Sequence, residues 1–549
     1  MDNSVDAISG IEIDQRVTAA MVKRIGLFAG PVLGLLCYYL LPAAYSTGAG
    51  DLVEFTHAGR ATLALMVWMA GWWLTEAVDI EATALLPIVA FPLLGIAPLS
   101  KVLPPYAADV IFLFMGGFII GLAIERWGLD RRIAFFILRL VGARPASIVG
   151  GFMAVTAFLS MWVSNTACAA MMVPIALSVI DLVLRRRTGA GLKESGGIPQ
   201  DRVGERNFAT GLLLSIAYAA SVGGVATIIG SPPNGIAVRY IEQTFGRDVT
   251  FFDWLLVGLP FTLIFLPLAW LLVTRVLFRA DIGEIEGGRQ LFEEQYRKLG
   301  PLARGEKIVL AVFSVTAFLW IASPLLTEIA VAGVKPLAGL SDAGIAMLAA
   351  LALFLIPADA AKGIRAMDWD TAAKLPWGVL ILFGGGLTLA ASIEANGVSA
   401  FIGNSSRALA GLPPLMLLLA ITAMTVFLSE LTSNTAQVAT MVPVLAAMAP
   451  MLGMNPYVLI LACTLGASSA YMMPVGTPPN AIVFGTGLVR LPQMMKAGFW
   501  LNLAGILVIT ALSALLITPL LGNVHRQTSR ANEGDAARSS YAAAADARR

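Results

Sequence analysis

The chain has 549 residues, of which 58% are hydrophobic and only 13% are charged. A mean hydropathy of +0.79, together with apolar windows of about 20 residues, indicates a polytopic helical membrane protein. The net charge of +2 is too small to predict a nucleic-acid partner. The three cysteines, Cys37, Cys168 and Cys463, lie in apolar segments without metal-ligand spacing, and we interpret them as buried thiols.

The N-terminal segment, residues 1–24, is polar and precedes an apolar run from Ile25 to Leu41. A signal peptide would need a basic leader, but this segment carries several acidic residues: Asp2, Asp6, Glu12 and Asp14. We therefore predict a cytoplasmic N-terminal segment followed by the first membrane helix.

Further apolar stretches predict membrane helices, and several are interrupted by Gly, Pro or Asn. They lie near residues 61–77, 82–97, 109–124, 146–182, 208–229, 251–278, 307–323, 342–357, 377–394, 414–450, 456–474 and 495–520. The charged stretch 281–306 predicts an amphipathic surface linker between two halves. The tail, 525–549, is rich in Ala, Arg, Ser and Asp, which predicts disorder.

The two halves, 25–280 and 307–524, read as repeats of each other. Three residue pairs share a separation of 269 residues: Glu125 with Glu394, Ser164 with Ser433, and Pro174 with Pro443. Both halves contain the string Ser-Asn-Thr-Ala, followed by Gly-Ser/Thr-Pro-Pro-Asn at Gly230 and at Gly476. Most of the change in register between these strings is explained by a polar insertion, 185–205, present only in the first half. A constant register over more than 40 residues indicates duplication rather than shared composition.

The flanking charges predict that the repeats have opposite orientations. Residues 126–206 carry eleven Lys or Arg, whereas residues 395–460 carry only Arg407. Under the positive-inside rule, the first Ser-Asn-Thr segment has its ends in the cytoplasm and the second has its ends outside. Inverted repeats of this kind are typical of secondary transporters.

Each Ser-Asn-Thr segment is longer than one crossing and has a polar break in its middle, which predicts a re-entrant hairpin. The Gly-Ser/Thr-Pro-Pro-Asn strings predict a second, discontinuous helix in each half. Inverted symmetry would bring the four breaks together near the membrane midplane. Hydroxyl and amide groups and half-helix N-termini there can hold carboxylates, while freed carbonyls can hold Na⁺.

Basic residues are absent from the segments that carry these motifs, 160–181, 211–238 and 411–489. A dianion without a basic partner would be costly to bind, so co-bound cations would supply the compensating charge. This predicts coupling in which the cation binds before the anion.

Individual strings and residues also have simpler interpretations. A single Ser-Asn-Thr or Pro-Pro string would be explained by helix packing or a kink, but the inverted duplication favours a site. The two histidines, His57 and His525, lie in loop-like surroundings, so we predict that the protein is not an enzyme. A structural role is favoured for Glu125 and Glu394. For Glu430 three roles stay open: tuning the second cation site, relaying a proton, or a structural pairing.

The paired Ser-Asn-Thr and Pro-Pro-Asn strings closely resemble those of the divalent anion/sodium symporter family, which carries di- and tricarboxylates and sulfate. The resemblance extends from about Trp72-Trp73-Leu74-Thr75-Glu76-Ala77 to Gly498. It implies an all-α membrane fold of two inverted repeats, with a scaffold domain and a transport domain that moves as an elevator. It also implies a homodimer in membrane lipid, and Na⁺ as coupling ion without an organic cofactor.

Transferred by position, the resemblance implies two sodium sites around one substrate. The first sodium site would use Ser160, Ser164, Asn165 and Gly230, and the second would use Ser429, Thr432, Ser433, Asn434 and Gly476. Substrate carboxylates would be held by Asn165, Thr166, Ser231 and Pro232 on one side and by Asn434, Thr435, Thr477 and Pro478 on the other. Ser231 stands where the family commonly has Thr, and the lost methyl bears on substrate size.

We therefore expect a sodium-coupled importer of C4-dicarboxylates such as succinate, malate or fumarate, in the plasma (inner) membrane. The alternatives are a sodium-independent dicarboxylate exchanger or a sulfate/citrate carrier and, from another class, an anion channel.

Overall fold

The protein is described by a computed structural model covering residues 2–46, 51–188, 191–192, 197–199, 201–285, 287–330 and 334–517. Within these ranges, eight helices are long and apolar enough to cross a membrane. The β structure found there is limited to two short antiparallel hairpins, β1 (Ala44–Ser46) with β2 (Leu52–Glu54) and β3 (Pro357–Asp359) with β4 (Ile364–Arg365). The predicted all-α polytopic fold is confirmed. The tail 525–549 and part of the insertion 185–205 lie outside the described residues.

The first half contains the helices that precede the charged linker. They are α1 (Asp2–Leu40), α2 (His57–Thr75), α3 (Ile80–Thr83), α4 (Leu86–Leu93), α5 (Leu99–Val102), the 3₁₀ turn η1 (Pro104–Ala107), α6 (Asp109–Arg126), α7 (Leu129–Leu138), α8 (Pro145–Ser160), α9 (Asn165–Thr188), α10 (Val203–Val225), α11 (Pro232–Phe245), α12 (Phe251–Leu271) and the π-helical turn η2 (Leu272–Leu277). Within the linker, α13 (Gly288–Lys298) forms an amphipathic helix.

The second half repeats this pattern of long and broken helices. It contains α14 (Arg304–Leu326), α15 (Asp342–Leu355), α16 (Trp369–Ala372), α17 (Trp377–Ala395), α18 (Val398–Ser405), η3 (Ser406–Leu409), α19 (Pro414–Ser429), α20 (Asn434–Met448), α21 (Pro456–Ala467), α22 (Pro478–Phe484), α23 (Leu491–Leu512) and η4 (Ser513–Ile517).

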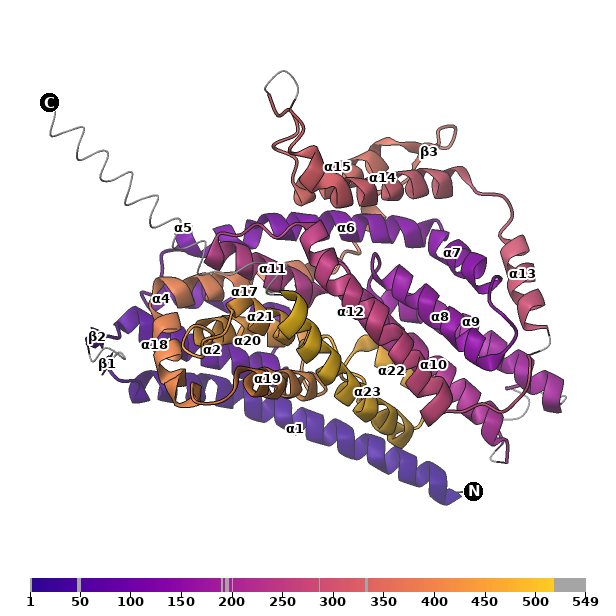
Figure 1. Ribbon diagram of the computed structural model, residues 1–549, viewed down its shortest axis with the longest axis horizontal. Helices are drawn as coiled ribbons and strands as arrows, with labels where there is room; N and C mark the ends of the chain where they lie inside the picture. The colour runs from indigo at the N-terminus through magenta and orange to yellow at the C-terminus, as the bar shows by residue number, and fades with distance from the viewer. Residues whose placement is uncertain are drawn as a thin grey trace.

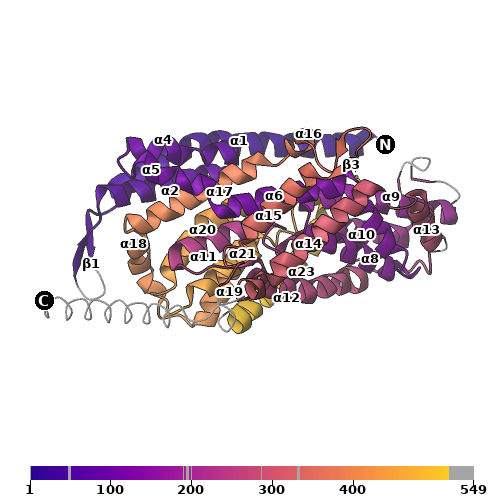
Figure 2. The ribbon, with the colours of Figure 1, turned by 90° about the horizontal axis from the view of Figure 1, so that it is seen from above.

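The helix breaks coincide with the duplicated motifs. α8 ends at Ser160 and α9 begins at Asn165, while α19 ends at Ser429 and α20 begins at Asn434. The α8–α9 hairpin lies toward the end of the molecule that carries α13, and the α19–α20 hairpin lies nearer α18 at the opposite end (Figures 1 and 2). The structure therefore places the two hairpins toward opposite ends of the protein.

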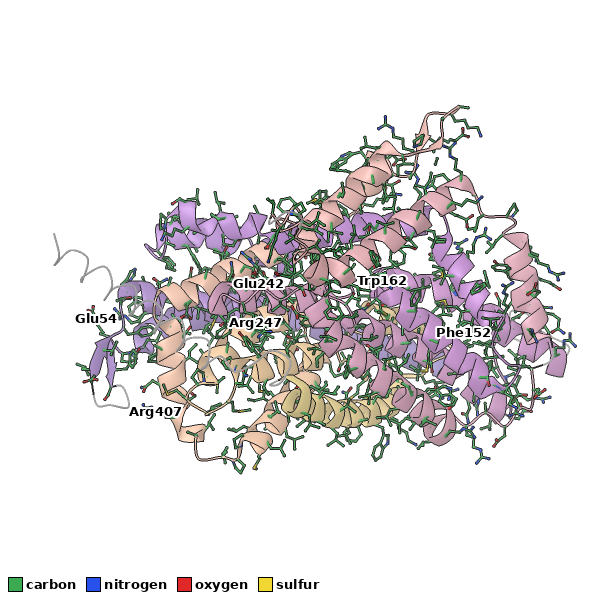
Figure 3. All side chains as sticks on the ribbon, turned by 45° about the horizontal axis from the view of Figure 1, so that its top comes forward. Glu54, Phe152, Trp162, Glu242, Arg247 and Arg407 are labelled. Carbon is green, nitrogen blue, oxygen red and sulfur yellow. The ribbon has the colours of Figure 1, made fainter. Side chains whose placement is uncertain are left out.

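The first hairpin runs from its end of the molecule toward the middle. Phe152, in the arm α8, lies nearer that end of the molecule than Trp162, which stands beside the helix break (Figure 3). Trp162 stacks on Phe251 with ring centroids 6.0 Å apart and meets Phe313 edge-on at 5.0 Å. These aromatic contacts fix the hairpin against α12 and α14 close to the motif.

The centre of the protein is α10, which is buried along its whole apolar window. It packs against α8 and α9 of the first hairpin and against α12 and α22. The helix α12 begins at a capping box in which Thr250 and Asp253 bond each other's backbone, and Asp342 accepts a further bond from Phe251 N. Helices from both halves therefore surround α10, which ends at the break before α11.

A buried ion pair joins the helix after α6 to the start of the second half. Arg132 Nε lies 2.6 Å from Glu306 Oε1, and Arg132 Nη2 lies 3.0 Å from Oε2. Arg132 also donates to the carbonyls of Leu299 and Gly300. This bidentate geometry fixes the chain entering α14 to α7.

Arg132→Leu is expected to lower the melting temperature of the purified protein strongly. The substitution leaves the Glu306 carboxylate buried without its partner, which typically costs about 3–5 kcal/mol. Arg132→Lys should lower the melting temperature less, because the charge remains while the two-pronged geometry is lost. Thermal unfolding in detergent measures both variants. A leucine variant as stable as the wild type would contradict the assigned role.

Candidate functional site

The first Ser-Asn-Thr motif packs against the break that follows α10. Ser160 Oγ lies 2.5 Å from Asn165 Oδ1 and donates to the Ala220 carbonyl at 2.7 Å. A Cβ built on Gly224 would lie 2.4 Å from Asn165 Oδ1 and 3.0 Å from Gly230 O. The structure thus brings together three residues of the predicted first sodium site, Ser160, Asn165 and Gly230, in a space that Gly224 leaves open.

The asparagine that ends each Pro-Pro-Asn string holds its own helix break in shape. Asn234 Nδ2 donates to the carbonyls of Gly224 and Thr227, at 3.0 and 2.8 Å. In the second half Asn480 Nδ2 donates to the carbonyls of Ala470 and Met473, at 3.1 and 3.0 Å. Each residue of the second set follows its counterpart by 246 residues, so the repeat seen in the sequence is also a repeat of contacts.

The second motif carries oxygen atoms that are buried and lack a hydrogen-bond partner. These include Asn434 Oδ1 and Thr477 Oγ1. A buried polar atom without a partner is costly, so such atoms commonly mark the place of a ligand. Gly476 lies in the break before α22 and is buried. A Cβ at this position would lie 3.3 Å from both Met473 O and Glu430 Oε2.

Two other residues of the predicted second sodium site are already hydrogen-bonded within their own hairpin. Ser429 Oγ donates to Val426 O at 3.0 Å, and Thr432 Oγ1 donates to Leu428 O at 2.9 Å. Both hydroxyls keep lone pairs that can accept a ligand bond. The second site is therefore arranged differently from the first, where Ser160 contacts Asn165 directly.

The residues before both proline pairs present unused hydroxyl groups. Ser231 and Thr477 precede α11 and α22 in extended backbone conformation, and neither side chain caps its helix. Their exposed fractions are only 5% and 6%. A buried hydroxyl at a helix N-terminus that makes no capping bond is suited to bind an anion there.

The remaining predicted residues lie around these breaks. Ser164 is exposed, and its Oγ accepts a bond from Ala167 N at 3.3 Å, so it caps the start of α9. The others occupy the starts of α9, α11, α20 and α22 or the residue before them: Thr166, Pro232, Ser433, Thr435 and Pro478. Of these, Thr166 and Pro478 are exposed, and the others are partly buried. The structure brings their backbones to the helix breaks.

The two halves interlock at the breaks. The helix after the second break, α22, packs against α9 and α10 of the first half. The helix after the first break, α11, packs against α20 and α21 of the second half. Tyr218 on α10 and Tyr471 in the second break meet edge-on, with ring centroids 5.4 Å apart. The geometry therefore places both pairs of motifs in one central region.

These oxygen atoms fit a hard monovalent cation. The groups available are hydroxyl, carboxamide and backbone carbonyl oxygens, the ligand types that hold Na⁺ in discontinuous transporter helices. The described residues contain no cluster of three or more His, Cys, Asp or Glu side chains that could hold a metal ion. Hydroxyl, carboxamide and carbonyl oxygens are hard ligands, which suit an alkali cation better than a soft transition metal.

The chain matches the family model described as the sodium:sulfate symporter transmembrane region over residues 49–522. The chain belongs to the divalent anion/sodium symporter family. The resemblance of the motifs is thereby confirmed, and with it the multi-pass membrane nature of the protein.

Curated relatives within the family include sodium-dependent dicarboxylate transporters. The protein of that name, SdcS, from Staphylococcus saprophyticus is 38% identical over 501 residues, covering 91% of this chain and 92% of the relative. The SdcS protein of Staphylococcus aureus matches with the same identity and coverage. Among solved structures, the Alcanivorax borkumensis YdaH transporter shares the fold, with a TM-score of 0.53 and 15% identity over 91% of this chain and 98% of that chain.

Several contacts that shape the site were not predicted from the sequence. Asn234 and Asn480 end the two Pro-Pro-Asn strings, and a repeated amide beside two prolines is a signal for a backbone contact. Gly224 carries no such signal, because its importance comes from the approach of Asn165 from another helix. Glu430 stands out as an acid in an apolar run, but its partners cannot be read from the sequence.

Proposed function

We propose that the protein takes up C4-dicarboxylates, such as succinate, malate or fumarate, together with Na⁺ across the plasma (inner) membrane. The observation that carries this proposal is the pair of repeat-related helix breaks, lined by hydroxyl, amide and carbonyl oxygens in segments without Lys or Arg. The similarity to relatives named as sodium-dependent dicarboxylate transporters supports both the ion and the substrate class.

In this proposal each pair of breaks holds one Na⁺ and the two pairs share one dianion. Ser160, Asn165 and the Gly230 carbonyl belong to the first cation site, and Asn434 and the Gly476 carbonyl to the second. The hydroxyls of Ser231 and Thr477 and the amides of Asn165 and Asn434 bind the carboxylates. Because the site segments carry no basic side chain, the cations supply the charge that makes dianion binding favourable.

We further propose that the protein works as a homodimer with its N-terminus in the cytoplasm and that the hairpins and broken helices move as an elevator against a scaffold. The repeats would span 25–280 and 307–524. Opposite placement of the two hairpins supports alternating access rather than a channel (Figure 1).

Replacing external Na⁺ with choline is expected to abolish uptake of labelled succinate into proteoliposomes, because the dianion then loses its compensating charge. Undiminished uptake in choline would contradict symport, and uptake that requires internal dicarboxylate would indicate an exchanger. Liposomes without protein serve as the control.

The description of the family model makes sulfate the second candidate substrate. An excess of unlabelled sulfate in the same assay distinguishes the two anions. We expect unlabelled malate to compete with labelled succinate and sulfate to leave uptake nearly unchanged.

A further inference from the structure

The second helix break is held by a buried carboxylate. Glu430, at the end of α19, is 4% exposed. Its Oε1 accepts from Tyr471 N at 2.7 Å, its Oε2 accepts from Met473 N at 3.0 Å, and Met472 N lies 3.0 Å from both oxygens. Asn502 Nδ2, on α23, donates to Oε1 at 2.7 Å. One side chain thus satisfies three consecutive N–H groups that the broken helix leaves unpaired.

The first half closes its break without a charge. Its helix α10 continues to Val225, the counterpart of Tyr471, whereas α21 in the second half already ends at Ala467. The repeat counterpart of Glu430 is Met161, 269 residues earlier. There the Thr227 hydroxyl donates to the Met161 carbonyl at 2.5 Å and accepts from Gly230 N at 3.1 Å. The two halves therefore share their asparagine contacts but differ by one buried carboxylate.

The charge of Glu430 lies next to the proposed second cation site. A Cβ on Gly476 would lie 3.3 Å from Glu430 Oε2, and the donors to the carboxylate are all amide N–H groups. Among the described residues no Lys or Arg forms an ion pair with Glu430. A carboxylate that is hydrogen-bonded but not neutralised attracts a nearby cation strongly in a low-dielectric interior.

We propose that Glu430 is a positioning residue that fixes the 471–473 segment for cation binding and makes the second site the stronger of the two sodium sites. This inference rests on the proposed sodium coupling. The carboxylate holds the backbone around Gly476 in its binding shape, and its charge adds an attraction that Met161 cannot supply to the first site.

The test compares Glu430→Gln, Glu430→Asp and Met161→Gln by the sodium dependence of succinate uptake. For Glu430→Gln we expect the half-saturating Na⁺ concentration to rise about tenfold, with the succinate KM at saturating Na⁺ within about threefold of wild type. Glu430→Asp keeps the charge on a shorter side chain. Its half-saturating Na⁺ concentration should therefore lie between those of the wild type and Glu430→Gln. Met161→Gln, which puts the same amide at the repeat-related position, should stay within about twofold of wild type.

A direct binding readout accompanies transport. The rise in melting temperature that Na⁺ produces over choline in detergent should shift to higher Na⁺ for Glu430→Gln, because the stabilisation by a ligand depends on its concentration relative to its Kd. If Glu430→Gln cannot be purified, the inference is tested by Glu430→Asp alone, whose half-saturating Na⁺ concentration should exceed that of the wild type.

The inference is overturned if Glu430→Gln or Glu430→Asp keeps the wild-type sodium dependence, if both are equally impaired, or if Met161→Gln is impaired as strongly. Failure of the proposed function would look different, because the wild type itself would then show no sodium dependence.

Discussion

Replacing both Asn165 and Asn434 with Ala is expected to reduce sodium-driven succinate uptake by at least about a hundredfold, because each loss of a buried hydrogen-bonding group costs about 1–3 kcal/mol. Asn165 contacts Ser160 and approaches Gly224 and Gly230, and Asn434 carries a buried oxygen without a partner. Both amides are proposed to bind Na⁺ and a carboxylate at once, so their removal affects both halves of the site. Initial uptake rates in proteoliposomes measure the effect.

A matched control is Asn404→Ala, on α18, where the same chemical change removes a bond to the Ser46 carbonyl outside the site. The control should transport normally. The double variant should keep a single peak in size-exclusion chromatography and a melting temperature near that of the wild type in choline. Retained uptake in a folded double variant would refute the assignment of both asparagines.

Gly224→Ala is expected to impair sodium-driven uptake severely while leaving the protein folded. The added Cβ would lie 2.4 Å from Asn165 Oδ1 and 3.0 Å from the Gly230 carbonyl. The end of the Asn165 side chain is the part that can move, so the cation site loses a ligand before the helix packing gives way. We expect the half-saturating Na⁺ concentration to rise about tenfold or more.

The repeat supplies a reason to test this position. The counterpart of Gly224 is Ala470, so the second half already accommodates a methyl group at this position, and Asn434 Oδ1, the counterpart of Asn165 Oδ1, makes no hydrogen bond. Gly411→Ala is the control, because a Cβ at Gly411 meets nothing within 4 Å. A Gly224→Ala variant with wild-type sodium dependence would show that Asn165 does not need this space.

The sequence was most informative for features that depend on neighbouring residues in the chain, such as hydropathy and helix breaks. Hydropathy predicted the all-α membrane fold, and the duplicated Ser-Asn-Thr strings predicted helix ends that the structure places at Ser160, Asn165, Ser429 and Asn434. Polar groups and proline break a helix through local backbone chemistry, so these positions can be read without knowing the neighbours.

Contacts between distant segments could not be read in the same way. The pairing of Arg132 with Glu306 joins residues 174 positions apart, and Glu430 meets its backbone donors 41 to 43 positions later. In both cases the sequence contains the charges but not the distance between them. Only the packing of the helices makes Glu306 an ion-pair partner and Glu430 an acceptor of backbone hydrogen bonds.

The membrane class, the duplication and the residue types of the candidate site follow from the sequence, because composition and repeat spacing are properties of the chain alone. The differences between the halves follow from the three-dimensional packing. A hydroxyl closes the first break and a carboxylate closes the second, and Asn165 lies against Gly224, whose counterpart in the second half is Ala470. These differences arise because helices far apart in sequence pack together and determine which oxygen atoms are bonded and which stay free for a ligand.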